Sequence, residues 1–133
     1  MRINWLKEYP FERNSLINVP EEPGIYQILQ SEEYQRYKNT TRILKIGASE
    51  SSLRSEIENH FIRHTVANRL ARIRNQKGIK VTFICALTDS GEAIKLEKHL
   101  LKEFEDHHWD LPLLNSTRGY TRGEDGHYKI NKE

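Results

Sequence analysis

The sequence predicts an α+β fold, with a small three-stranded antiparallel sheet flanked by helices in the order β-β-α-α-β-α. Three short segments rich in aliphatic residues predict the strands, at 24–29, 42–47 and 79–87. Apolar residues at helical spacing predict two helices after the second strand and one after the third. At 133 residues the chain has the size of one domain, so we expect 1–133 to share a single core.

The two ends of the chain lack a sustained apolar period. Residues 1–22 are interrupted by prolines and are expected to form an extension that packs its aromatic residues on the sheet. Pro23-Gly24 marks a turn before the first strand. The polar stretch 30–41 is expected to be a loop or a short helical excursion. Residues 116–133 predict a loop-rich tail with a late strand at 127–130.

The middle of the chain holds the second strand and two helices. Alternation along 42–47 predicts that Leu44 and Ile46 share an aliphatic side, opposite Lys45. Serines at 51 and 52 favour a helix start, after which an apolar line follows at i, i+4 spacing: Leu53, Ile57 and Phe61. A second helix is expected from His64 or Thr65 to Asn75, closed by glycine at 78.

The third helix, expected at 90–107, contains a carboxylate in its apolar stripe. Glu97 lies near the middle of the arc formed by Ala93, Leu96, Leu100, Leu101 and Phe104. Burying an ionised carboxylate costs several kcal/mol unless it is paired, metal-bound or neutralised. Glu97 is therefore either a residue at the end of a shallow core that reaches a cation or a backbone donor, or a metal ligand or acid–base group in a cleft.

The composition limits the class of protein. Apolar residues make up 36% of the chain and charged residues 30%, and no apolar run is long enough to span a membrane. The polar N-terminus does not resemble a secretory signal. The single cysteine, Cys85, excludes a disulfide framework within the chain and the usual multi-cysteine zinc sites. We therefore expect a cytoplasmic protein without a membrane partner.

The charges are unevenly distributed although the net charge is only +2. Residues 61–80 contain six lysines or arginines and no acid, whereas residues 89–110 contain seven acids and three lysines. The basic stretch is either a solvated helix surface or a face that attracts the phosphates of a nucleic acid.

Four short motifs occur in a recognisable order. They are Gly24-Ile25-Tyr26, Lys45-Ile46-Gly47, the helix with its central Glu97, and Leu114-Asn115. Together they span about residues 20–116, and they resemble the GIY-YIG nuclease superfamily. The resemblance implies a DNA substrate, Mg²⁺ or Mn²⁺ as the cofactor, and hydrolysis of phosphodiester bonds as the reaction.

The resemblance also implies roles for individual residues. The implied catalytic residues are Tyr26, Lys45, His60, Glu97 and Asn115, with Glu97 as the metal ligand. Tyr26 would orient or deprotonate a water molecule, and Lys45 would lower the pKa of Tyr26 or act as the base itself. His60 would shuttle a proton, and Asn115 would position the glutamate or the phosphate.

Contacts to DNA phosphates are expected from a basic set that consists of Arg54, Arg63, His64, Arg69 and Arg72. His60 and His64 also have a spacing that could bind zinc, but no third ligand is apparent. Two positions depart from the family pattern: Lys45 replaces a tyrosine, and Glu56 stands where the family has its catalytic arginine. Arg63 or Arg69 would have to supply the missing cation.

Three functions remain open on the sequence alone. The first is a metal-dependent endonuclease, and the second is a catalytically silent nucleic-acid-binding domain on the same fold, which Glu56 favours. The third is a protein-interaction domain. The sequence determines neither the form of DNA that is bound nor the oligomeric state.

Overall fold

The structure is a computed structural model that describes residues 3–62, 64–115, 120–122 and 128–130. For His64, Thr65 and the last two segments it describes the backbone only. Within these residues, no helix combines the length and the apolar character needed to cross a membrane.

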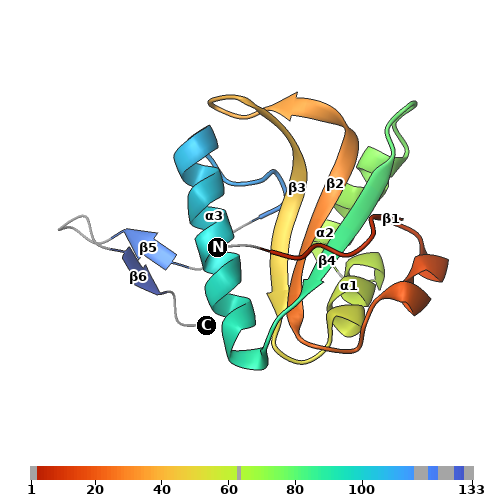
Figure 1. Ribbon diagram of the computed structural model, residues 1–133. Coiled ribbons are helices and arrows are strands. Elements are labelled where there is room, and N and C mark those ends of the chain that lie inside the picture. Colours follow the sequence, from red (N-terminus) through yellow and green to blue (C-terminus); the bar gives the residue numbers. More distant parts are fainter. Residues whose placement is uncertain (1–2, 63, 116–119, 123–127, 131–133) are drawn as a thin grey trace.

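A four-stranded sheet forms the centre of the molecule, in the order β1-β4-β2-β3 (Figure 1). The strands are β1 (Tyr9–Pro10), β2 (Gly24–Gln35), β3 (Thr40–Ser49) and β4 (Val81–Leu87). All the neighbouring strands run antiparallel. The predicted α+β class, with an antiparallel sheet flanked by helices, is confirmed.

The helices cover the sheet from two sides (Figure 1). They are α1 (Leu53–Ile62), α2 (His64–Arg74), α3 (Ser90–His108) and a short 3-10 helix, η1 (Arg13–Asn18). The larger apolar cluster joins α1, α2 and η1 to one face of the sheet, and its buried members include Phe11, Tyr26, Ile28, Leu53, Ile57, Leu70 and Phe83. A smaller cluster joins α3 to β3 through Ile46, Leu101 and Phe104.

The sheet has four strands, one more than the three that the sequence predicted. Strand β1 adds to the outer edge of β4, where Tyr9 pairs with Phe83 and Pro10 pairs with Thr82. A two-residue strand that contains a proline has no alternation to detect, and proline is tolerated only because this strand lies at the edge. The expected extension at 1–22 thus supplies both β1 and η1, and Phe11 packs in the core.

The expectation of a loop or helical excursion at 30–41 is wrong for most of that stretch. Strand β2 continues to Gln35, where Gln35 pairs with Thr40 and Tyr34 with Thr41, so only a tight turn remains between β2 and β3. The long hairpin carries polar residues because it extends beyond the core. In the tail, β5 (Tyr120–Arg122) pairs with β6 (Tyr128–Ile130), and β6 falls at the expected late strand; the rest of the tail lies outside the described residues.

Strand β3 contains a bulge at Leu44, next to Lys45. Ile28 pairs with Lys45, but the next residue, Leu29, pairs with Ile43, so Leu44 is an extra residue opposite the β2 strand. Such a bulge breaks the alternation of side chains. Leu44 joins the larger cluster and Ile46 the smaller one, so the predicted shared side of Leu44 and Ile46 is wrong.

Candidate active site

Gly47 makes room for the ring of Tyr26. The two residues face each other across β2 and β3. A Cβ atom at position 47 would lie 2.3 Å from both Cζ and Oη of Tyr26, much closer than any ordinary contact. Tyr26 is only 1% exposed. The glycine of the second motif is therefore needed for the tyrosine of the first to lie flat against β3.

Tyr26 is linked to helix α1 through His60. The Tyr26 hydroxyl lies 3.1 Å from Nε2 of His60, and Nδ1 of the same ring lies 2.9 Å from the Glu56 carbonyl oxygen. Because a carbonyl only accepts, Nδ1 carries a proton, and in the neutral ring Nε2 then accepts from the Tyr26 hydroxyl. The fold thus brings together Tyr26 and His60, two predicted site residues that are 34 positions apart in the sequence.

Burial makes a Tyr26 phenolate unfavourable. It raises the pKa of Tyr26 well above its ordinary value, and the negative charges of Glu56 and Glu97 add to the increase. This is opposite to the lowering by Lys45 that the sequence suggested. Tyr26 is therefore a neutral phenol in the folded chain.

Lys45 is influenced by the charges of two carboxylates, Glu97 and Glu56. Burial lowers the pKa of Lys45, while the charges of Glu97 and Glu56 raise it and so oppose the effect of burial. Lys45 in turn lowers the pKa of each of these carboxyl groups. The ammonium group is therefore close enough to α1 and to α3 to act on both helices, and an ammonium group with a lowered pKa gives up its proton more easily.

Glu97 carries the expected signature of a carboxylate in an apolar stripe. Burial raises the pKa of Glu97 to about 7, and Glu56 contributes further to this increase. The side chain remains partly accessible, between the buried positions Ala93 and Leu101 of the same helix. At neutral pH Glu97 is therefore poised between its charged and neutral forms, which is typical of functional sites.

Glu56 belongs to the same site as Tyr26, Lys45 and Glu97, although the sequence analysis did not include it among the candidate site residues. It lies one helical turn before His60 on α1, and burial raises the pKa of its carboxyl group. Its charge acts on Tyr26, Lys45 and Glu97. Glu56, which the resemblance aligns with an arginine, therefore brings a negative charge to the site.

Asn115 holds the end of the described core against β3. Its Nδ2 donates to the Ile46 carbonyl oxygen at 2.9 Å, and its Oδ1 accepts from the Ile46 amide at 2.9 Å. The Leu114 amide donates to the Leu44 carbonyl oxygen at 2.8 Å. These bonds fix the backbone on both sides of Lys45, so Asn115 is a positioning residue for this strand.

We expect Asn115→Ala to destabilise the fold by about 1–3 kcal/mol, because it removes two hydrogen bonds to the β3 backbone. Urea unfolding measures this loss. Asn115→Asp keeps the acceptor and loses the donor, so its free energy of unfolding should lie between those of wild type and Asn115→Ala. A loss under about 0.5 kcal/mol in the alanine variant would mean that solvent replaces these bonds without cost.

Glu97 also predicts a pH dependence of stability in EDTA. Because its pKa is about 7 in the folded chain against an ordinary value of 4.5, the folded chain binds more protons between these two pH values. Stability should therefore fall as the pH rises from 5 to 7, by about 1–2 kcal/mol after allowance for solvent screening. Glu97→Gln should show a smaller fall in urea unfolding, with a remainder from the raised pKa of Glu56, and an identical fall in the variant would assign it to other groups.

Two of the predicted phosphate-binding residues make contacts within the fold. Arg54 Nε donates to the Val19 carbonyl oxygen at 2.9 Å, and this side chain pairs with Glu21, so Arg54 ties α1 to the N-terminal segment. Arg69 donates to the Leu113 carbonyl oxygen at 3.0 Å.

The other three predicted phosphate-binding residues are Arg72, Arg63 and His64. Arg72 is exposed on α2. Arg63 and the side chain of His64 lie outside the described residues. A DNA contact by any of the five residues stays a prediction, and so does the suggestion that Arg63 or Arg69 supplies the missing cation.

The residues fit a weakly held divalent ion better than a closed metal cage. Among the described residues, no group of three or more His, Cys, Asp or Glu is placed to hold a metal. Mg²⁺, however, usually binds through one or two carboxylates and completes its shell with water and substrate phosphates. Glu97 offers such a carboxylate, and a cation beside it would favour its ionised form.

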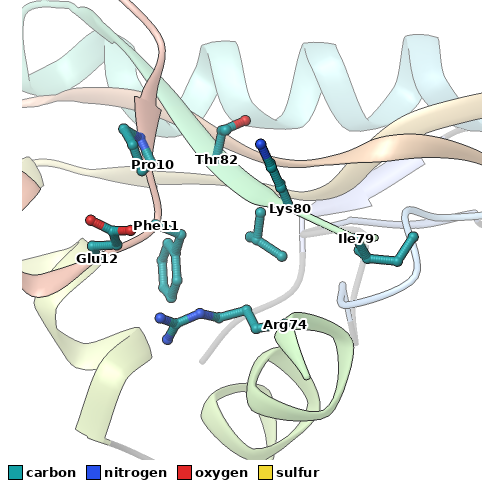
Figure 2. Close-up of a pocket in the computed structure, with 8 residues that line it drawn as sticks. Pro10, Phe11, Glu12, Arg74, Ile79, Lys80 and Thr82 are labelled. Atoms are coloured by element: carbon teal, nitrogen blue, oxygen red, sulfur yellow. The ribbon is translucent and has the colours of Figure 1, made fainter. Parts of the chain in front are cut away.

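A hollow of about 370 Å³ lies away from this cluster, at the β1–β4 edge of the sheet (Figure 2). Phe11 and Val81 line it, with Glu12, Arg74 and Lys80 as its charged members. Strand β3 forms the opposite edge of the sheet. The hollow therefore contains none of the predicted catalytic residues.

Comparison with known proteins finds no matching family model, no matching curated protein and no matching solved structure. Any function assigned to this chain therefore rests on its own residues and on their geometry.

Proposed function

We propose that this chain is a divalent-metal-dependent endonuclease that hydrolyses DNA phosphodiester bonds in the manner of the GIY-YIG superfamily. The chief support is one observation. Tyr26 on β2 and Lys45 on β3 both lie close enough to Glu97 on α3 for its charge to raise their pKa values, and Lys45 in turn lowers the pKa of Glu97. His60 on α1 joins them through its hydrogen bond to Tyr26.

Lys45 is the candidate for the general base. Hydrolysis requires a water molecule that loses a proton as its oxygen attacks phosphorus. Burial lowers the pKa of Lys45, so a neutral amine is more accessible there than on an exposed lysine. The Tyr26 hydroxyl, whose proton is directed to His60, leaves its oxygen lone pairs to accept a bond from that water.

Glu97 is the candidate metal ligand. When bound, a divalent ion would stabilise the charge that develops on the phosphate and on the leaving oxygen. Glu97 must be ionised to hold this ion, and its pKa of about 7 means that the ionised form predominates above neutral pH.

The test is cleavage of DNA by the purified chain in Mg²⁺ or Mn²⁺, with EDTA as the blank. The panel should contain supercoiled plasmid, linear duplex, a duplex with a single-stranded flap, and a four-way junction. We expect metal-dependent cleavage of at least one form. Products that form equally in EDTA, or no cleavage of any form, would overturn the proposal.

A second candidate is a catalytically silent DNA-binding domain on the same fold. Glu56 favours it, because a carboxylate in the position of the family's arginine repels the phosphate instead of binding it. This candidate expects salt-sensitive DNA binding that is equal in wild type and Glu97→Gln and is unchanged by EDTA. Metal-dependent cleavage that is lost in Glu97→Gln would exclude it.

A further inference from the structure

Two large aromatic side chains stack on each other at the surface, at the tip of the β2–β3 hairpin. The rings of Tyr37 and Trp109 have centroids 5.6 Å apart and planes inclined by 26°. Tyr37 is 77% exposed and Trp109 is 59% exposed. The Nζ atom of Lys38 lies 5.0 Å from the centre of the Trp109 ring. We call these three residues the aromatic platform.

The aromatic platform is held by hydrogen bonds between the hairpin and the end of α3. The Lys38 amide donates to the His108 carbonyl oxygen at 2.9 Å, and His108 Nδ1 donates to the Lys38 carbonyl oxygen at 3.0 Å. Asn39 Nδ2 donates to the His107 carbonyl oxygen at 3.0 Å. Asn39 and Trp109 both have positive φ angles. The exposed rings are thus preorganised, so a ligand would bind with little ordering cost.

The charges beside the platform favour an anionic ligand. The second half of α3 and the residues just after it are rich in acids, but two of these acids are neutralised near the platform. Asp110 pairs with Arg36, and Asp106 pairs with the Lys102 ammonium at 2.8 Å. Lys38 makes no ion pair within the described part of the chain, so its charge remains available to a phosphate.

The aromatic platform lies at the C-terminal end of the helix that carries Glu97. Helix α3 runs alongside β3, and the β2–β3 hairpin reaches the C-terminal end of this helix (Figure 1). Trp109 follows Glu97 by twelve residues, which corresponds to roughly 18 Å along the helix axis. A nucleic acid bound at Glu97 could therefore reach the platform within about five base-pair steps.

We propose that the aromatic platform stacks an unpaired base, so that the preferred substrate is DNA with a single-stranded segment beside the cleaved bond. The outer face of Tyr37 would receive the base, and Lys38 would contact a neighbouring phosphate. A paired base inside a duplex offers no free face to such a platform, whereas every unpaired base does. This inference deepens the proposed function and rests on it for the position of the cleaved bond.

The test measures DNA binding in EDTA, which removes the divalent ion that the proposed cleavage requires, so that binding is measured without cleavage. Fluorescence anisotropy with a labelled oligothymidylate and with a labelled duplex of equal length compares wild type, Tyr37→Ala and Trp109→Ala. We expect single-strand affinity to fall about fivefold to a hundredfold in each variant, because stacking contributes about 1–3 kcal/mol per base. Duplex affinity should change by less than about twofold, because neither variant removes a phosphate contact.

Two further variants make the result specific. Tyr37→Phe keeps the ring and should bind the single strand as wild type does. Ile17→Ala removes a side chain that is 80% exposed on η1, and it should change neither affinity. Thermal unfolding of every variant checks the fold, and Tyr37→Ala should melt as wild type does because its ring is largely exposed.

Three results would overturn the inference. One is unchanged single-strand binding in Tyr37→Ala, and another is an equal loss for single strand and duplex. The third is a loss of self-association in Tyr37→Ala, seen by sedimentation, without any effect on DNA binding; it would make the platform a protein interface. If the platform binds single strands but no cleavage occurs with any metal, only the proposed nuclease activity fails.

Discussion

Replacing Glu97 by Gln is expected to reduce metal-dependent DNA cleavage by at least about a thousandfold, because the loss of a metal ligand removes several kcal/mol of transition-state stabilisation. The variant should remain folded. Since burial raises the pKa of Glu97, a neutral amide should be tolerated at least as well as the carboxylate at pH 7.5. Initial cleavage rates, measured together with urea unfolding, separate lost chemistry from lost structure.

The matched control for this prediction is Glu92→Gln, which makes the same chemical change on the same helix. Glu92 is exposed in the first turn of α3, so its replacement should leave cleavage unchanged. Cleavage that survives in Glu97→Gln, or that falls equally in both variants, would mean that Glu97 does not hold the metal.

Replacing Gly47 by Ala is expected to lower both stability and cleavage. The new methyl group would lie 2.3 Å from the Tyr26 hydroxyl, and the buried ring would have to move. Such overpacking costs about 1–3 kcal/mol. The movement would also displace the Tyr26 hydroxyl from His60, and a displacement of about 1 Å at a catalytic group can reduce the rate about a hundredfold. Urea unfolding and initial rates measure the two effects.

Gly91→Ala is the control for that variant. A Cβ atom at position 91 meets nothing within 4 Å, and alanine is the better helix former. We expect equal or higher stability and normal cleavage. If Gly47→Ala behaved in the same way, the close packing between Tyr26 and β3 would not be needed for the site.

The sequence predicted the fold class because its main elements carry strong local patterns. The strand at 79–87 and the helix beginning at Ser90 lie where aliphatic content and helical spacing placed them. Strand β1 was missed because its two residues are held only by pairing with β4. The bulge at Leu44 was missed for a related reason: it depends on how β3 pairs with β2, which no property of β3 alone reveals.

The candidate site was partly predictable from sequence. A glutamate in an apolar stripe is conspicuous without any structure, and the motifs around Tyr26 and Gly47 are short but ordered. Glu56 could have been added to the site, since it precedes His60 by one helical turn. The direction of the Tyr26 pKa shift was not predictable, because it depends on how deeply the ring is buried and on which charges surround it.

The aromatic platform left no signal in the sequence. Tyr37 and Trp109 are separated by 72 positions, and each alone is an ordinary exposed aromatic residue. They meet because the hairpin of β2 and β3 reaches the end of α3, and this contact depends on the length of both elements.

The measurement that tests the proposed nuclease most directly is nicking of supercoiled plasmid by wild type and by Glu97→Gln, in Mg²⁺, in Mn²⁺ and in EDTA. Lys45 and Glu97 at one site predict nicking by wild type in at least one metal, none in EDTA, and none by the variant. Equal nicking by both proteins, or nicking that persists in EDTA, would contradict a metal site at Glu97. Intact plasmid in every reaction, together with uncut flap and junction DNA and with DNA binding by both proteins, would contradict the nuclease and favour the silent binding domain.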